Sequence, residues 1–296
     1  MAHQEPCPWS WEFIAKNWRF SLWQQEPAVW FSSDNGVVRR MNLALLWHFV
    51  RQDFSDRYSG VALGRGWLLI TPMLQILIFV IIFGGLIGPR LPGTLSGAFG
   101  YGIYLVSGIL PWTAFANTIS RTTTVFFDKR AILSKVPVSL FLVAAHVAIV
   151  EGITLACTLS LFTLLGMILS IPLSPGLLAI PLLILSQQLM AFSLGLIGSI
   201  LMVFLRDIRE LVGVVTLLWF WMVPIVYTID SVPHFMQAIQ AYNPAWWFIR
   251  EYHQIFVYGA MPDMGHIALM LAGSGLVVAI MIWFLSSSEH QIRDAI

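Results

Sequence analysis

The stretch LLITPMLQILIFVIIFGGLI, from Leu68 to Ile87, contains no charged residue over about 20 positions. About 20 apolar residues in a helix are needed to cross the ~30 Å hydrocarbon core of a bilayer. Arg65 and Arg90 stand on either side of this run. The run therefore predicts a membrane-spanning helix, and similar runs follow it along the chain.

Five more spans are predicted. Tyr101 to Ser120 forms the second, and Pro111 within it is tolerated where neighbouring helices satisfy the freed carbonyl. Between Val136 and Leu205 the only charge is Glu151, and the turn signal SIPLSPG at Ser170 to Gly176 divides this stretch into spans three and four. The last two spans are Leu211 to Tyr227 and Gly265 to Leu285.

The composition excludes an ordinary soluble domain. Hydrophobic residues make up 58% of the 296 residues and charged residues 10%, against about 45–50% and about 25% in soluble domains. The net charge of +1, with Lys and Arg in loops, gives no indication of a nucleic-acid partner. The two cysteines, Cys7 and Cys157, indicate neither a disulfide framework nor a CxxC metal site.

The basic residues predict the orientation. Lys and Arg favour the cytoplasmic side of short loops. With the N-terminus inside, only Arg90 and Arg250 of the 16 basic residues fall outside. We therefore expect a multi-pass protein of the bacterial inner membrane with both termini in the cytoplasm.

A helix on the cytoplasmic membrane surface is predicted before the first span. Leu43, Leu46, Trp47, Val50 and Phe54 recur at helical spacing, and most polar residues of the segment fall on the other side. On the outer side, the aromatic segment Ile229 to Asp263 is broken by two prolines and is expected to form two short helices that dip into the outer leaflet.

The chain is thus predicted to be an all-α integral membrane protein with one membrane domain. The expected divisions are a cytoplasmic N-terminal segment at 1–41, the amphipathic interface helix at 42–57, the six-span domain at 58–288 and a cytoplasmic tail at 289–296.

Sequence signals for catalysis are missing. No Gly-Lys pair occurs, so the chain has no phosphate-binding P-loop, and any ATP must be bound by another protein. The seven histidines show no HExxH spacing that would predict a metal site. A GxSxG elbow is absent as well. A membrane-embedded transferase would need clustered acids or histidines near one membrane face, which the spans lack. We expect a transport subunit rather than an enzyme.

Glu151 and His146 are polar residues inside a predicted span. A charge there costs roughly 2.5–3.5 kcal/mol on insertion scales and is usually paired or faces water. Glu151 could contact a proton or a substrate. Alternatively, it could clasp another helix, with His146 or the end of a neighbouring span as its partner.

Aromatic rings in spans two and five also have two interpretations. Most such rings form interface belts or packing contacts. If some face a pore, they could stack on sugar rings much as aromatic side chains stack on bases. The candidates for a glycan channel are Tyr104, Trp112, Phe115, Trp219, Phe220, Trp221 and Tyr227.

The segment TTTVFFDKRAILSKVP, from Thr122 to Pro137, is short and basic, with two aromatic residues. Its composition is typical of a small helix at the membrane surface. Its basic residues could simply keep this loop on the cytoplasmic side of the membrane, or the segment could dock a cytoplasmic partner.

Several segments together resemble the ABC-2 type polysaccharide-export permeases. The first is MNLALLWHFVRQDFSDRYSGVALGRGWLLITPMLQILIFVIIFGGLIG, at Met41 to Gly88, in which an interfacial helix precedes an RY…LG…W…P pattern. The resemblance covers roughly Asn42 to Leu285 and is nearest to the Wzm-like permeases of O-antigen export, with KpsM-like capsule and TarG-like teichoic-acid permeases as relatives. Further matching stretches are SGILPWTAFANTISR at Ser107 to Arg121, Asp128 to Pro137, FLRDIRELVGVV at Phe204 to Val215, and FWMVPIVYTIDSVP with the following YNP up to Pro244.

This resemblance implies the cargo and the partners. It implies a homodimer with a channel between protomers, two copies of a separate Wzt-like ATP-binding subunit that holds ATP and Mg, and export of a lipid-linked polysaccharide of O-antigen type. A capsule, teichoic-acid or small-molecule cargo remains the alternative. The implied coupling residues are Arg51, Arg57, Phe126, Phe127, Asp128, Lys129 and Arg130, and the implied outer gate residues are Phe235, Tyr242, Trp246 and Trp247.

Overall fold

The structure is a computed structural model that describes residues 43–59, 64–83, 100–135, 138–168 and 174–295. Within these ranges the chain forms helices and connecting turns, with no β-strand. The all-α prediction is therefore confirmed for the described residues. The predicted N-terminal segment at 1–41 lies outside them.

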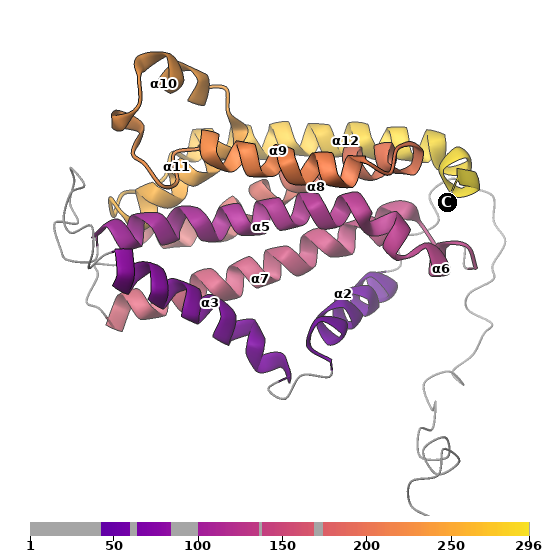
Figure 1. The fold of residues 1–296 in the computed structure, drawn as a ribbon, viewed down its shortest axis with the longest axis horizontal. Helices are drawn as coiled ribbons and strands as arrows, with labels where there is room; N and C mark the ends of the chain where they lie inside the picture. Colours follow the sequence, from indigo (N-terminus) through magenta and orange to yellow (C-terminus); the bar gives the residue numbers. More distant parts are fainter. Residues whose placement is uncertain (1–42, 60–63, 84–99, 136–137, 169–173, 296) are drawn as a thin grey trace, which may run out of the picture. The chain divides into compact units, whose positions relative to one another are not determined.

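Long helices pack side by side in Figure 1. Helix α5 packs against both α7 and α8, α12 lies along α8, and α2 packs on α7. In chain order, the elements are α2 (Leu43–Tyr58), η2 (Gly64–Gly66), α3 (Trp67–Ile78), η3 (Phe79–Phe83), α5 (Gly100–Asp128), α6 (Arg130–Leu133), α7 (Leu140–Ile168), η4 (Pro175–Ala179), α8 (Ile180–Phe204), α9 (Ile208–Met222), η5 (Ile229–Ser231), α10 (His234–Gln240), α11 (Pro244–Phe256) and α12 (Met264–Ala295).

By length and composition, three helical segments in the described ranges could cross a membrane: Leu140–Ile168, Pro175–Phe204 and Met264–Glu289. The apolar segment Trp67–Phe83 is shorter. Helix α5 matches α7 in length, at 29 residues each, but is less apolar because it carries several Ser and Thr residues and Arg121. The count of six spans stays a prediction.

The fifth predicted span differs from the structure at its end. The sequence predicts a span from Leu211 to Tyr227, but α9 ends at Met222. Val223 is extended, with ψ 134°, and it precedes Pro224. The ring of a proline disfavours helical conformation in the residue before it, so the helix stops there. Residues 223–227 are consequently not helical.

Two other helices run further than the sequence predicts. Helix α5 continues through Asp128, so the first half of the basic segment at 122–137 extends a long helix and only Arg130–Leu133 forms a separate short one. Helix α12 continues to Ala295, through the residues predicted as a C-terminal tail. By contrast, α10 and α11 match the two short helices expected in the segment that Pro233 and Pro244 break.

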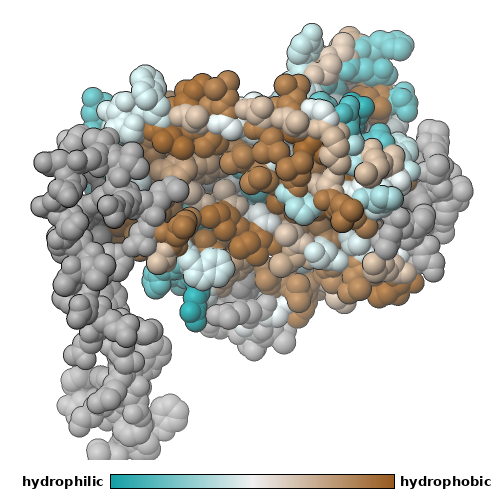
Figure 2. All heavy atoms as spheres, turned by 180° about the vertical axis from the view of Figure 1, so that it is seen from behind, coloured by the Kyte–Doolittle hydropathy of each residue, from teal (hydrophilic) through white to brown (hydrophobic). Residues whose placement is uncertain are grey.

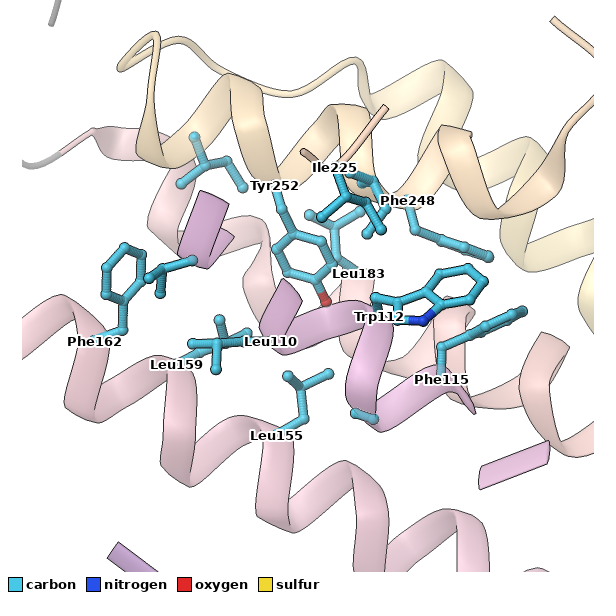
Figure 3. Packing of buried hydrophobic residues seen from close by; sticks show 14 of the residues in the cluster. Leu110, Trp112, Phe115, Leu155, Leu159, Phe162, Leu183, Ile225, Phe248 and Tyr252 are labelled. Atoms are coloured by element: carbon cyan, nitrogen blue, oxygen red, sulfur yellow. The ribbon is translucent and has the colours of Figure 1, made fainter. Parts of the chain in front are cut away.

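Two groups of buried apolar residues hold the helices together. The larger, called here the Trp112 cluster, contains Trp112, Phe115, Leu159, Leu183 and Tyr252 and joins α5, α7, α8 and α11 (Figure 3). The smaller, called here the Phe126 cluster, joins α2, α5, α6, α7, α8 and α12 through Phe49, Phe126, Leu140, Phe192 and Leu285. The two clusters lie at different ends of α5, and we name these the α11 end and the α2 end.

Apolar side chains also cover much of the surface. Helix α9 has no buried residue, and its exposed side chains are mostly aliphatic or aromatic. Hydrophobic residues spread across the face seen in Figure 2. Such exposure is costly in water and normal in lipid. These faces are suited to contact with membrane lipid or with other apolar helices.

Candidate functional site

Four charged side chains meet where α2, α5 and α7 come together at the α2 end. Arg121 of α5 donates from Nη2 to Asp53 Oδ1 of α2 and from Nη1 to Glu151 Oε1 of α7, each at 2.7 Å. Arg57, one turn after Asp53 on α2, also donates to Glu151, and its Nε lies 3.3 Å from Asp53 Oδ2. We call these residues, Asp53, Arg57, Arg121 and Glu151, the four-charge cluster.

The four-charge cluster is electrically balanced and partly shielded from water. The acidic side chains are 11% and 3% exposed, whereas the arginine side chains are 26% and 31% exposed. Each acid contacts both arginines, so neither buried carboxylate is left without a counter-charge. The cluster binds three helices to one another by charge-assisted hydrogen bonds.

The structure shows the contacts expected if Glu151 joins helices to one another. Glu151 clasps other helices, and its partners are Arg57 and Arg121. His146 packs elsewhere on α7, with its ring 5.6 Å from that of Phe49 on α2. In the described structure, Arg57 faces Glu151 and Asp53 rather than standing clear of the protein as a contact for an ATPase.

Helix α2 has three faces, not the two expected from its sequence. Leu46, Phe49, Val50, Asp53 and Arg57 recur at helical spacing and face α5 and α7. Asp53 is thus a polar residue on a buried face, and the two arginines of the cluster neutralise its charge. A second, apolar edge carries Leu43, 68% exposed, and Trp47, 62% exposed. The third face is polar and carries His48, Arg51 and Ser55, all exposed.

The coupling residues predicted around α6 are not equally accessible. Phe126 is fully buried in the Phe126 cluster, so its side chain supports the fold and offers no surface to a partner. Phe127 and Lys129 are half-buried. Asp128 and Arg130 are exposed, and Asp128 accepts a hydrogen bond from Thr124 at 2.7 Å. Arg51 is exposed as well.

The predicted channel aromatics separate into buried and exposed rings. Trp112 and Phe115 are buried, and their rings lie 6.1 and 5.5 Å from that of Trp219. Phe115 also packs near Phe248 of α11 (Figure 3). These contacts place Trp112 and Phe115 inside the single chain rather than on a surface that a channel between chains would use. Trp219 and Phe220 are half-buried, and Trp221 is 59% exposed.

The two predicted channel tyrosines stabilise the broken segment after α9. Tyr104 is buried, and its hydroxyl lies 3.1 Å from the carbonyl oxygen of Pro224 and 2.9 Å from that of Tyr227. The Tyr227 hydroxyl donates to the last carbonyls of α9, those of Trp221 and Met222, each at 3.0 Å. Carbonyls without helical partners are thereby satisfied.

The predicted outer gate residues lie around α10 and α11. Phe235 is 66% exposed and Tyr242 is 85% exposed. Trp246 and Trp247 are half-buried, and Trp247 donates from its indole to the carbonyl of Ala241 at 2.9 Å. Exposed apolar rings on short helices can contact lipid or a partner, and their role as an outer gate stays a prediction.

The sequence analysis does not single out a carboxylate that is buried in α11. Glu251 of α11 is 1% exposed. Its Oε2 accepts from the Asp263 amide at 3.1 Å, and its Oε1 lies 3.1 Å from His266 Nδ1. Asp263 in turn accepts from the first amides of α12, those of Gly265 and His266. Glu251 therefore joins α11 to the start of α12.

Sequence reasoning offered the end of a neighbouring span as a partner of Glu151, but it named neither Arg121 nor Asp53. The signal existed, because an acid within an apolar run needs a counter-charge, and Arg121 directly follows the second predicted span. Among the described residues, no group of three or more His, Cys, Asp or Glu side chains could hold a metal ion. The absence of a metal site stays a prediction for the whole chain.

Three export permeases are similar to this chain in sequence. An O-antigen export system permease protein RfbA of Klebsiella pneumoniae is 25% identical over 230 residues, covering 76% of this chain and 86% of that relative. A second protein of that name from the same organism is 25% identical over 218 residues, 73% and 82% of the two chains. A protein of that name from Myxococcus xanthus is 24% identical over 252 residues, 84% and 93% of the two chains.

A family model described as ABC-2 type transporter matches residues 44–257. The matched range runs from α2 to the end of α11 and includes the whole four-charge cluster. It covers well over half of the chain, and it confirms at the family level the resemblance found in the sequence. The chain belongs to the ABC-2 type transporter family, whose members are membrane components of transporters.

Proposed function

We propose that this chain is the permease subunit of an ATP-driven exporter that moves a lipid-linked polysaccharide of O-antigen type from the cytoplasm to the periplasm. One observation carries the proposal: the likeness to three O-antigen export system permeases extends over at least 73% of this chain and 82% of each relative. The family match at residues 44–257 includes the span candidates Leu140–Ile168 and Pro175–Phe204 and the short helices α10 and α11.

The subunit would act as a homodimer in the inner membrane, with six spans and both termini in the cytoplasm. The supporting observations are the charge asymmetry of the loops and the exposed apolar faces of α9 and α12. Apolar helix faces of this kind can pack against a second copy as well as against lipid.

ATP and Mg would be bound by two copies of a separate ATP-binding subunit at the α2 end. The three faces of α2 support this arrangement. Its apolar edge, with Leu43 and Trp47, suits the headgroup region of a bilayer, and its polar face, with Arg51, would remain in the cytoplasm. Asp128 and Arg130 are exposed near α6 and are the more accessible contacts there.

A deletion strain tests the proposed function. Removal of the gene should abolish surface glycan and leave lipid-linked glycan inside the cell, and the intact gene should restore export. Restoration should also require the ATP-binding subunit in an active form. Normal surface glycan in the deletion strain, with loss of a small-molecule or other glycan export activity instead, would contradict the polysaccharide assignment.

A further inference from the structure

A groove lies between α7 and α8 on the surface of the described chain. It has a volume of about 590 Å³, within the range of about 300–1,000 Å³ that is usual for clefts that hold small ligands. Leu159, which is 1% exposed, lies at its bottom, and Leu164 and Met167, which are 53% and 50% exposed, lie at its rim. Both helices contribute to the lining, with Ala156, Ser160 and Thr163 from α7 and Ile180, Pro181 and Ile184 from α8.

Short side chains on α7 leave this space open. Helices α7 and α8 meet at Gly152, where an added Cβ atom would lie 3.4 Å from Gln188 Cγ. Ala156 and Ser160 follow at a spacing of four residues, so they lie on the same face of α7 as Gly152. Their short side chains leave the packing between the two helices incomplete at this point. The groove is therefore a gap in a helix contact.

The lining of the groove is suited to an apolar ligand. None of the residues that line it is charged. The hydroxyls of Ser160 and Thr163 donate to carbonyl oxygens of their own helix, at 2.7 and 2.8 Å. No lining side chain thus keeps a free proton for a phosphate or a sugar hydroxyl. A polar ligand would lose its hydrogen bonds to water here and gain none in return.

The position of the groove indicates what covers it. All ten lining residues belong to the span candidates Leu140–Ile168 and Pro175–Phe204, so the groove opens to the hydrocarbon core of the bilayer. Exposed apolar surface continues beside it at Leu182 and Leu185 of α8. A stable protein interface usually involves about 20–30 residues on each side, more than this groove offers. A single flexible chain fits it better than a second copy does.

We propose that the groove between α7 and α8 binds one acyl chain of a bilayer phospholipid, which completes the packing of the two helices. Lipid chains are as apolar as leucine, so the hydrophobic effect does not drive the chain into the groove. The gain comes from dispersion contacts that the walls of an unfilled gap would lack. The inference goes beyond the proposed function, because it concerns neither the cargo nor the ATP-binding subunit.

Photolabelling of the full-length chain in a bilayer tests the site. The probe is a phosphatidylethanolamine with a photoreactive diazirine in one acyl chain, at a low mole fraction among unlabelled phosphatidylethanolamine and phosphatidylglycerol. The label on groove residues should exceed that on Leu269 and Leu276 by about tenfold, the ratio that a modest difference in binding free energy produces. Those leucines are 62% and 63% exposed, in the half of α12 that begins beside α11. Equal labelling of the groove and of α12 would overturn the proposal.

A filled groove provides a second measurement. Ala156→Leu combined with Ser160→Leu should lower the label on the groove by about tenfold and leave the label on α12 unchanged. Ser287→Leu is the matched control, because Ser287 is an exposed serine whose hydroxyl also bonds within its own helix. An undiminished groove label in the folded double variant would contradict the proposal. If that variant does not fold, the comparison with α12 still decides, since it needs no substitution.

Two further arms distinguish other occupants. A polyisoprenyl phosphate that displaces the labelled phospholipid at an equal mole fraction would assign the groove to a carrier lipid and overturn the proposal. In a chain with Cys7→Ser and Cys157→Ser, Leu164→Cys would place a thiol at the rim of the groove. A disulfide between two copies in oxidised membranes would assign the groove to a second protomer, also against the proposal. A label that resists displacement, without such a disulfide, supports it.

Discussion

The hydroxyl of Tyr104 on α5 lies between two carbonyl oxygens of the segment that follows α9, 3.1 Å from that of Pro224 and 2.9 Å from that of Tyr227. Replacement of Tyr104 by Phe removes the donor from the buried contact with Pro224 and the partly buried contact with Tyr227. We expect Tyr104→Phe to lower the free energy of unfolding by about 1–3 kcal/mol. Unfolding of the purified protein in detergent micelles measures the change.

Tyr242→Phe is the control for Tyr104, because Tyr242 is 85% exposed. It should change the free energy of unfolding by no more than about 0.5 kcal/mol. Equal effects of the two substitutions would mean that the Tyr104 hydroxyl does not stabilise the segment after α9.

The close contact between α5 and α8 depends on a glycine. A Cβ atom on Gly198 of α8 would lie 2.4 Å from Thr123 Oγ1 of α5. Gly198→Ala should therefore force the helices apart and destabilise the protein by about 1–3 kcal/mol. Thr123→Ala in the same chain removes the nearest atoms and should recover part of the loss.

Gly213→Ala provides the matched comparison for Gly198, because a Cβ at Gly213 of α9 meets nothing within 4 Å. Alanine is the better helix former by up to about 1 kcal/mol, so this variant should be neutral or more stable. The same micelle unfolding experiment applies to both glycines, and a destabilising Gly213→Ala would speak against close helix contact as the cause.

The sequence predicts most of the helices because long apolar runs have few alternative structures in a membrane. The prediction fails where a local interaction decides the conformation of the backbone. The residues of the fifth predicted span are apolar up to Tyr227, yet Pro224 ends α9 at Met222. Hydropathy alone does not register that conformational effect, since Pro224 stands among apolar residues.

The candidate site could be predicted only in part, because the sequence gives residue types without their neighbours. Glu151 stands out as a charge in an apolar run, but nothing in the order of residues selects Arg121 over His146 as its partner. The aromatic rings show the same limit: Trp112 and Trp221 are alike in sequence terms, yet one is 7% exposed and the other 59%. Tertiary packing supplies this difference.

The ion pair between Arg121 and Glu151 can be measured by a double-mutant cycle. Glu151→Gln and Arg121→Gln each leave an opposite charge partly buried and without one of its partners, so each should be destabilising. The double variant should cost less than the sum, with a coupling energy of about 1–3 kcal/mol. Thr158→Val, on the same helix α7, serves as the control because the Thr158 hydroxyl bonds only within its own helix in the described structure. If the changes in the free energy of unfolding of the two single variants add up to that of the double variant, the ion pair contributes nothing to stability.

Glu251 should hold the turn between α11 and α12 through its two acceptor oxygens. Glu251→Gln keeps an oxygen for the Asp263 amide and should lower the free energy of unfolding only slightly. Glu251→Leu removes both acceptors and should lower the free energy of unfolding by about 1–3 kcal/mol. Limited proteolysis near Asp263, in protein that is otherwise folded, measures the loosening. Equal protection of the Leu variant and the wild type would contradict this role.

Trp221 is the predicted channel ring that stands most exposed, whereas Trp112 is buried among Phe115, Trp219 and Phe220. Trp112→Ala should therefore destabilise the protein by about 3–5 kcal/mol through the cavity it leaves. Trp221→Ala should leave the folded amount unchanged and reduce surface glycan, because an aromatic ring stacked on a passing sugar is expected to contribute about 1–3 kcal/mol, as for stacked bases. Trp221→Phe keeps an aromatic face and should retain most export. If Trp221→Ala cells carry normal surface glycan, the ring does not contact the glycan and faces lipid or another helix instead.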